Sequence, residues 1–72
     1  MTAPHFIAPG LAHDAIRERC SLAASYASAA ASLAATGDTA ATVHSLGCAA
    51  RTIMAALEAA EALRPSNRGR RA

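Results

Sequence analysis

Apolar residues recur at helical spacing through the first half of the chain. Two neighbouring stripes advance in alternating steps of four and three residues, which keeps side chains on one face of packed helices. The stripes are Ile16, Cys20, Ala23, Ala27, Ala30 and Ala34, and Ala15, Arg19, Leu22, Tyr26, Ala29 and Leu33. No segment sustains a period of two, and alanine favours helices over strands. The pattern therefore predicts a long helix.

The second half carries one apolar stripe with the same spacing. It consists of Val43, Leu46, Ala50, Ile53, Leu57 and Ala60, and it is flanked by Gly47, Met54 and Glu61. A polar series, His44, Arg51 and Glu58, recurs every seven residues and is expected to face outward. The stripe and the polar series together predict a second amphipathic helix.

The residues between the two halves read as a helix stop followed directly by a helix start. Gly37 can end a helix in the left-handed conformation. Asp38 can then accept backbone N–H bonds as the N-cap of the next helix. We expect helices at about 11–35 and 39–64, with Pro65 stopping the second.

These elements predict an all-α fold, an antiparallel helical hairpin. The alanine stripe lets the helices approach at the short end of the usual ~8–10 Å range, with Ala27 near Gly47 and Ala23 near Ala50. The residues assigned to the core of the hairpin or of a dimer are Ile16, Ala23, Ala27, Leu33, Leu46, Gly47, Ala50, Ile53, Met54 and Leu57.

Composition adds a reason to expect self-association. The chain has 72 residues, and 53% of them are hydrophobic, mostly alanine, with one Tyr and one Phe as the only aromatic residues. A domain this small with small apolar side chains has a thin core and needs a partner, a metal or disulfides. We expect a homodimer in which two hairpins form a four-helix bundle.

The two ends of the chain differ from the body. Residues 1–10 contain Phe6, which is expected to strap across the end of the bundle or to reach into a partner's groove. Residues 65–72 are rich in arginine, proline and glycine and are expected to be a disordered tail. The tail is either solubilising or a phosphate-binding arm, while the net charge of +2 does not by itself imply a nucleic-acid partner.

No membrane location is expected. The segment from Cys20 to Gly37 has no charged residue, but it has many hydroxyls, few large apolar side chains and no flanking basic anchors. The first residues lack the basic and sustained apolar run of a secretory signal. The expected location is cytoplasmic, with both cysteines reduced.

No constellation of residues indicates a reaction, so the chain is expected not to be an enzyme and to hold no cofactor or metal. His44 and Cys48 have the spacing of two metal ligands on one helical face, but no third ligand follows at a recognisable spacing. Binding of a partner protein is the expected activity. The candidate anchors for it are Phe6, Leu22, Tyr26 and Arg51.

The order "FIAPGLAHDAI", an alanine-rich helix, a "GD" turn and "AARTIMAALEAAEAL" resembles a group of very small bacterial and phage proteins of unknown function. In size and layout it is also similar to a phage-encoded quorum-sensing anti-activator. The resemblance covers residues 6–63, and Ala12 stands where a capping Ser or Thr is expected. It implies a two-helix homodimer that binds and disables host regulatory proteins, and it carries over no functional residue.

The function expected from the sequence is that of a small protein-binding regulator, encoded by a phage or mobile element, which modulates a host protein such as a transcription regulator. Two alternatives remain open. One is a small nucleic-acid-associated protein that uses the basic tail. The other is a structural or chaperone subunit of a larger assembly.

Overall fold

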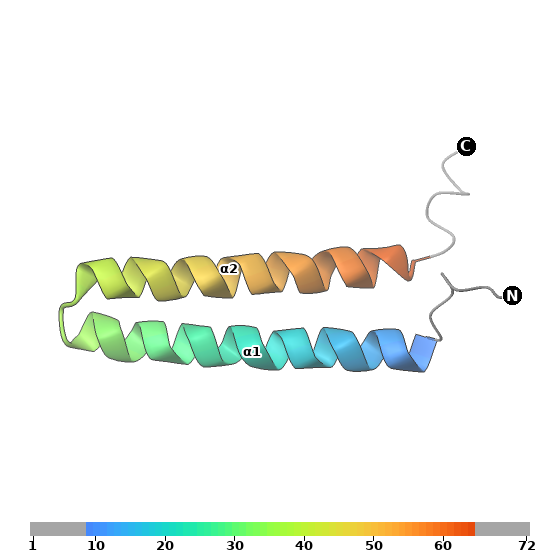
Figure 1. Cartoon of the computed structure of the whole chain (residues 1–72), viewed down its shortest axis with the longest axis horizontal. Helices are drawn as coiled ribbons and strands as arrows, with labels where there is room; N and C mark the ends of the chain where they lie inside the picture. Colours follow the sequence, from blue (N-terminus) through green and yellow to red (C-terminus); the bar gives the residue numbers. More distant parts are fainter. Residues whose placement is uncertain (1–8, 65–72) are drawn as a thin grey trace, which may run out of the picture.

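The chain forms two antiparallel helices joined by a tight turn (Figure 1). This computed structural model describes residues 9–64, in which helix α1 spans Pro9–Ala35 and helix α2 spans Thr39–Ala62. The all-α helical hairpin predicted from the sequence is confirmed. The predictions for Phe6 and for the basic tail at 65–72 lie outside the described residues.

The helix limits differ from the expected ones by two residues at each outer end. Helix α1 begins at Pro9 rather than at residue 11, because proline lacks the N–H that the first helical residue cannot use and its fixed φ suits that position. Pro9 and Gly10 therefore belong to the helix and not to a preceding strap. Helix α2 ends at Ala62, and the N–H of the C-cap Leu63 donates to the carbonyl of Ala60.

The turn has the two signals that the sequence predicted. Gly37 adopts φ +81°, and its N–H donates to the Ala34 carbonyl at 3.0 Å. The N–H of Asp38 donates to the Leu33 carbonyl at 3.1 Å, which completes the usual pairing at a helix end closed by a left-handed glycine. Asp38 Oδ1 accepts the Ala41 N–H at 3.0 Å and so caps α2.

The contact between the helices, here called the seam, is made of small side chains. Its buried residues are Ala23 and Ala30 on α1 and Ser45, Ala49 and Ala56 on α2. Half-buried residues continue it at the same spacing: Ala12, Ile16, Tyr26 and Leu33 on α1, and Thr42, Thr52, Ala59 and Leu63 on α2. None of the larger side chains of the described residues is fully buried. Packing at the centre of the seam therefore depends on the close approach of the backbones.

Polar residues in the seam find partners on their own helix. The Thr42 hydroxyl donates to the Asp38 carbonyl at 2.7 Å, and the Thr52 hydroxyl donates to the Cys48 carbonyl at 2.8 Å. Within residues 9–64, no buried side-chain nitrogen or oxygen lacks a hydrogen-bond partner. The seam can thus contain hydroxyls without an unsatisfied buried group.

The apolar stripe predicted on α2 lies one residue out of phase with the seam. Ala49 is 9% exposed, whereas the neighbouring Ala50 is exposed. On α1 the exposed Ala27 likewise lies beside the half-buried Tyr26. One residue corresponds to a rotation of about 100° around the helix axis. The expected pairing of Ala23 with Ala50 is therefore displaced to Ala49, and the large side chains of the predicted stripe lie outside the hairpin core.

A search of the described residues for a membrane-crossing helix finds none of sufficient length and apolarity.

Candidate interaction surfaces

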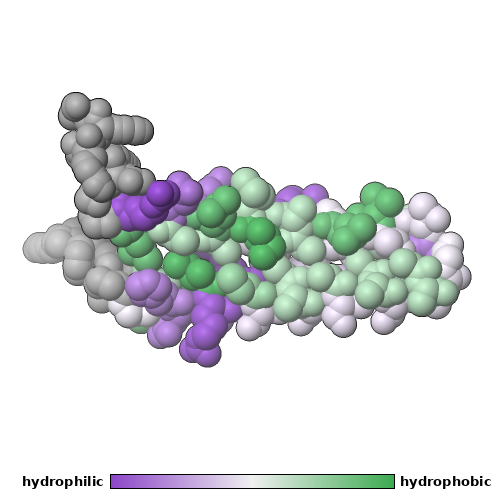
Figure 2. Space-filling model, turned by 180° about the vertical axis from the view of Figure 1, so that it is seen from behind, coloured by the Kyte–Doolittle hydropathy of each residue, from purple (hydrophilic) through white to green (hydrophobic). Residues whose placement is uncertain are grey.

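One side of the hairpin, here called the apolar face, combines two rows of uncharged residues. Each row lies one position after the seam residues, and in antiparallel helices equal offsets fall on the same side. The large-residue row on α2 is Val43, Leu46, Ala50, Ile53 and Leu57, and the small-residue row on α1 is Cys20, Ala24, Ala27, Ala31 and Ala34. Figure 2 shows hydrophobic residues covering both helices over this face, with hydrophilic residues gathered toward the end away from the turn.

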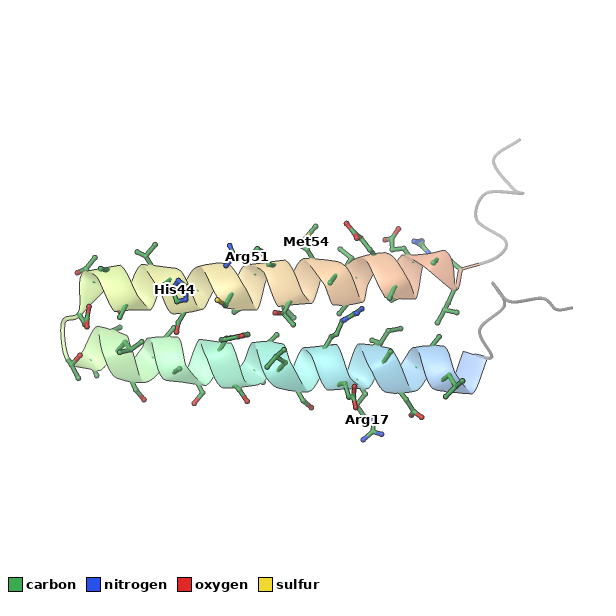
Figure 3. All side chains as sticks on the ribbon, viewed as in Figure 1. Arg17, His44, Arg51 and Met54 are labelled. Carbon is green, nitrogen blue, oxygen red and sulfur yellow. The ribbon has the colours of Figure 1, made fainter. Side chains whose placement is uncertain are left out.

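Four large apolar side chains of the large-residue row are exposed along the middle of α2. Val43 is 62% exposed, Leu46 51%, Ile53 47% and Leu57 48%. The charged pair Arg17 and Asp14, 3.6 Å apart, borders this face, and Arg17 points away from α2 (Figure 3). The apolar face therefore has the composition of an interface core with a polar rim at one end.

The opposite side, here called the mixed face, contains apolar, aromatic and ionisable groups. Leu22 is 48% exposed, and Tyr26 and Cys48 are half-buried. The Cys48 thiol lies 3.7 Å from His44 Nε2 and 3.6 Å from Arg51 Nη2. Helix α1 ends at Ala35 and α2 begins at Thr39, and both rise equally per residue away from the turn. Two residues, one on each helix, therefore lie at the same distance from the turn, or level, when their numbers sum to about 74. Tyr26 is thus level with Cys48.

Three of the four predicted partner anchors lie at a similar level along the hairpin. Leu22, Tyr26 and Arg51 lie within about one helical turn of one another in level. Arg51 points away from α1 on the outer edge of α2, where Met54 does the same (Figure 3). It therefore borders the mixed face while Leu22 and Tyr26 lie within it. The fourth anchor, Phe6, lies outside the described residues.

The residues assigned to a hairpin or dimer core divide between two places. Ile16, Ala23 and Leu33 lie in the seam. The others lie on the surface of the hairpin or are half-buried beside it: Ala27, Leu46, Gly47, Ala50, Ile53, Met54 and Leu57. The role of this second group in a dimer interface stays a prediction. Val43, the most exposed member of the large-residue row, was not among the residues assigned to a core.

The ionisable residues form no arrangement suited to a metal ion in the described part of the chain. No group of three or more His, Cys, Asp and Glu side chains comes together there. Cys20 and Cys48 are both free thiols, Cys20 exposed and Cys48 half-buried. The contact of Cys48 with Arg51 is a feature that the sequence analysis missed, although the spacing of three residues within a helix indicates it.

An open pocket of about 180 Å³ lies beside the turn. It is lined by Ala34, Gly37, Thr39, Thr42 and Val43, and none of these side chains is ionisable. The pocket therefore offers no general acid or base to a substrate. The candidate recognition features of residues 9–64 are therefore the surfaces of the hairpin.

Comparisons of this chain with protein-family models, with curated proteins and with solved structures find no match. The functional argument therefore depends on the two faces of the hairpin.

Proposed function

We propose that this chain is a small protein-binding regulator that acts as a homodimer and has no catalytic activity. In keeping with the resemblance noted from its sequence, we propose that it is encoded by a phage or mobile element and modulates a host regulatory protein, such as a transcription regulator, by direct contact. Its site of action is the cytoplasm, where Cys20 and Cys48 would remain thiols.

The observation that carries this proposal is the exposure of large apolar side chains outside a seam of small ones. Four members of the large-residue row and Leu22 are each about half exposed, although the seam buries only alanines and one serine. Contiguous exposed apolar surface on a small chain is typical of sites that bind another protein. Because exposed apolar side chains lie on both sides of the hairpin, one side can serve self-association and the other can serve a different partner.

The mixed face suits the different partner. Tyrosine and arginine are over-represented among the residues that dominate binding energy at interfaces. Tyr26 lies one helical turn from the exposed Leu22, and Arg51 borders the face from α2, so that hydroxyl, guanidinium and thiol groups there offer hydrogen bonds as well as apolar contact. A surface of this kind can select one protein among many.

The proposal is tested by affinity capture from a bacterial lysate with three forms of the chain. These are the natural sequence, Leu22→Asp on the mixed face, and Ser28→Asp as a matched control at an exposed position of the same helix. We expect the natural sequence and the control to retain one protein in stoichiometric amount, and Leu22→Asp to lose it. The captured protein is then assayed with and without the chain, for example for DNA binding if it is a transcription regulator.

Either of two results would count against the proposal. If no protein is retained in stoichiometric amount, the role as a regulator of a host protein is wrong. If Leu22→Asp retains the partner as well as the control does, the mixed face is not the binding surface.

A further inference from the structure

We infer that a second copy of this chain docks on the apolar face so that the large-residue row of each α2 lies on the small-residue row of the partner's α1. The inference rests on the homodimer in the proposed function, but it does not depend on the identity of any host protein. It assigns an arrangement to that dimer, with a two-fold axis parallel to the helices.

The first argument for a second copy is the deficiency of the hairpin core. Its buried apolar residues are four alanines, and the Val, Leu and Ile side chains of α2 remain 47–62% exposed. From Val43 to Ile53, a partner of the same composition covers these side chains without meeting a charge, while Leu57 lies level with the partner's Arg17 at the polar rim.

The size of the apolar face supports the same occupant. Helix α2 has 24 residues, which gives a length of about 36 Å at about 1.5 Å per residue. Two adjacent helices, each about 10 Å across, make the face roughly 20 Å wide. The resulting area of roughly 700 Å² is that of the whole side of the hairpin, its polar end included, and it is close to the ~800 Å² that each partner contributes to a stable interface.

The second argument concerns which row meets which. Two flat hairpins can stack about a two-fold axis that lies either across the helices or parallel to them. An axis across the helices places α2 on the partner's α2, so large side chains meet large ones on one side and alanine meets alanine on the other. An axis parallel to the helices places α2 on the partner's α1, so each large side chain meets a small one and the spacing is even across the interface.

The register agrees with the parallel axis. This axis preserves level along the hairpin, and residue numbers that sum to about 74 are level. Val43 then faces the partner's Ala31, Leu46 faces the partner's Ala27, Ala50 faces the partner's Ala24, and Ile53 faces the partner's Cys20. A large side chain faces a small one at three of these four levels, and two alanines meet at the fourth, whereas the fifth member of the row, Leu57, lies level with the partner's Arg17.

The arrangement is tested by disulfide trapping at Ala24 and Ala50. In a chain with Cys20→Ala and Cys48→Ala, we introduce Ala24→Cys, Ala50→Cys or both, and oxidise the folded protein with copper phenanthroline. We expect a covalent dimer on a non-reducing gel only when both cysteines are present, or when chains with one each are mixed. Ser28→Cys, on an exposed part of α1, measures the background.

Every other pattern would overturn the inference. Cross-linking of Ala50→Cys alone means that the two α2 helices stack on each other. A dimer by light scattering that gives no cross-link at these positions means that another face mediates association. A monomer by light scattering means that the chain does not form a homodimer. Capture of a host protein from lysate, and its loss in Leu22→Asp, tests the proposed regulatory function independently of this result.

A second measurement in the natural cysteine background guards against misfolding of the cysteine variants. Light scattering should show Leu46→Asp as a monomer and Leu22→Asp as a dimer, with both helical by circular dichroism. A dimeric Leu46→Asp would contradict the inference even if the trapping experiment could not be performed.

Discussion

The substitution Ala30→Leu should destabilise the protein, because Ala30 lies in the seam with 3% of its surface exposed. The matched control is Ala29→Leu, the same change one residue earlier at an exposed position of the same helix. Leucine and alanine have similar helix propensities, so neither variant changes the intrinsic stability of α1 greatly. The difference between the two variants then reports the space available in the seam.

The expected magnitude follows from overpacking. A leucine adds three carbon atoms where two backbones approach each other closely, and such insertions cost about 1–3 kcal/mol. For a domain of this size, each kcal/mol lowers Tm by roughly 4–8 °C. Ala30→Leu should therefore melt roughly 10 °C below Ala29→Leu if the cost is near the middle of the range.

The assay is urea denaturation followed by circular dichroism, with thermal melting as a second readout. All variants are compared at one protein concentration, because the stability of a dimer depends on concentration. Equal midpoints for Ala30→Leu and Ala29→Leu would refute the reasoning. They would mean that the seam accepts a large side chain and that smallness is not what holds the helices together.

Further predictions concern the turn, a helical glycine and the tail. Gly37→Ala should cost about 1–2 kcal/mol in urea denaturation because residue 37 has φ +81°, and an unchanged midpoint would mean that the turn relaxes. Asp38→Ala should cost about 1 kcal/mol through loss of the N-cap bond, while Asp38→Asn should retain most of the stability. Gly47→Ala should stabilise the protein by about 0.5–1 kcal/mol, since the nearest atom to an added Cβ is the flexible guanidinium of Arg51 at 3.4 Å; a loss of stability would indicate a close contact there. Deletion of 65–72 should leave capture of the partner protein unchanged, and salt-sensitive DNA binding that disappears with the deletion would favour the nucleic-acid alternative instead.

The number of helices and the turn between them could be predicted from the sequence because their signals are local. Gly37 and Asp38 determine a stop and a start through their own backbone and side-chain chemistry. The alanine-rich segments on either side have high helix propensity regardless of what they contact. Helix α1 begins two residues before the expected start because proline suits the first helical position, a preference that the apolar pattern does not contain.

The phase of the seam could not be predicted from hydrophobicity. The most apolar stripe on α2 is the series containing Val43 and Ile53, yet the helices meet along the series containing Ser45 and Ala49. Close packing selects small side chains, and a search for large apolar ones therefore finds the outer face. On α1, alanines lie on several adjacent faces, so these faces are about equally apolar. Only the tertiary structure distinguishes the face that packs against α2.

The position of the turn has a consequence for the outline of the whole assembly. Both ends of the described chain, Pro9 and Arg64, lie at the same extremity of the hairpin, and Gly37 lies at the other (Figure 1). If the two copies share an axis that runs along their length, both ends of the described part of each copy lie at a single pole. The opposite pole, which carries the turn at Gly37 in both copies, is then left free for a label or a tether.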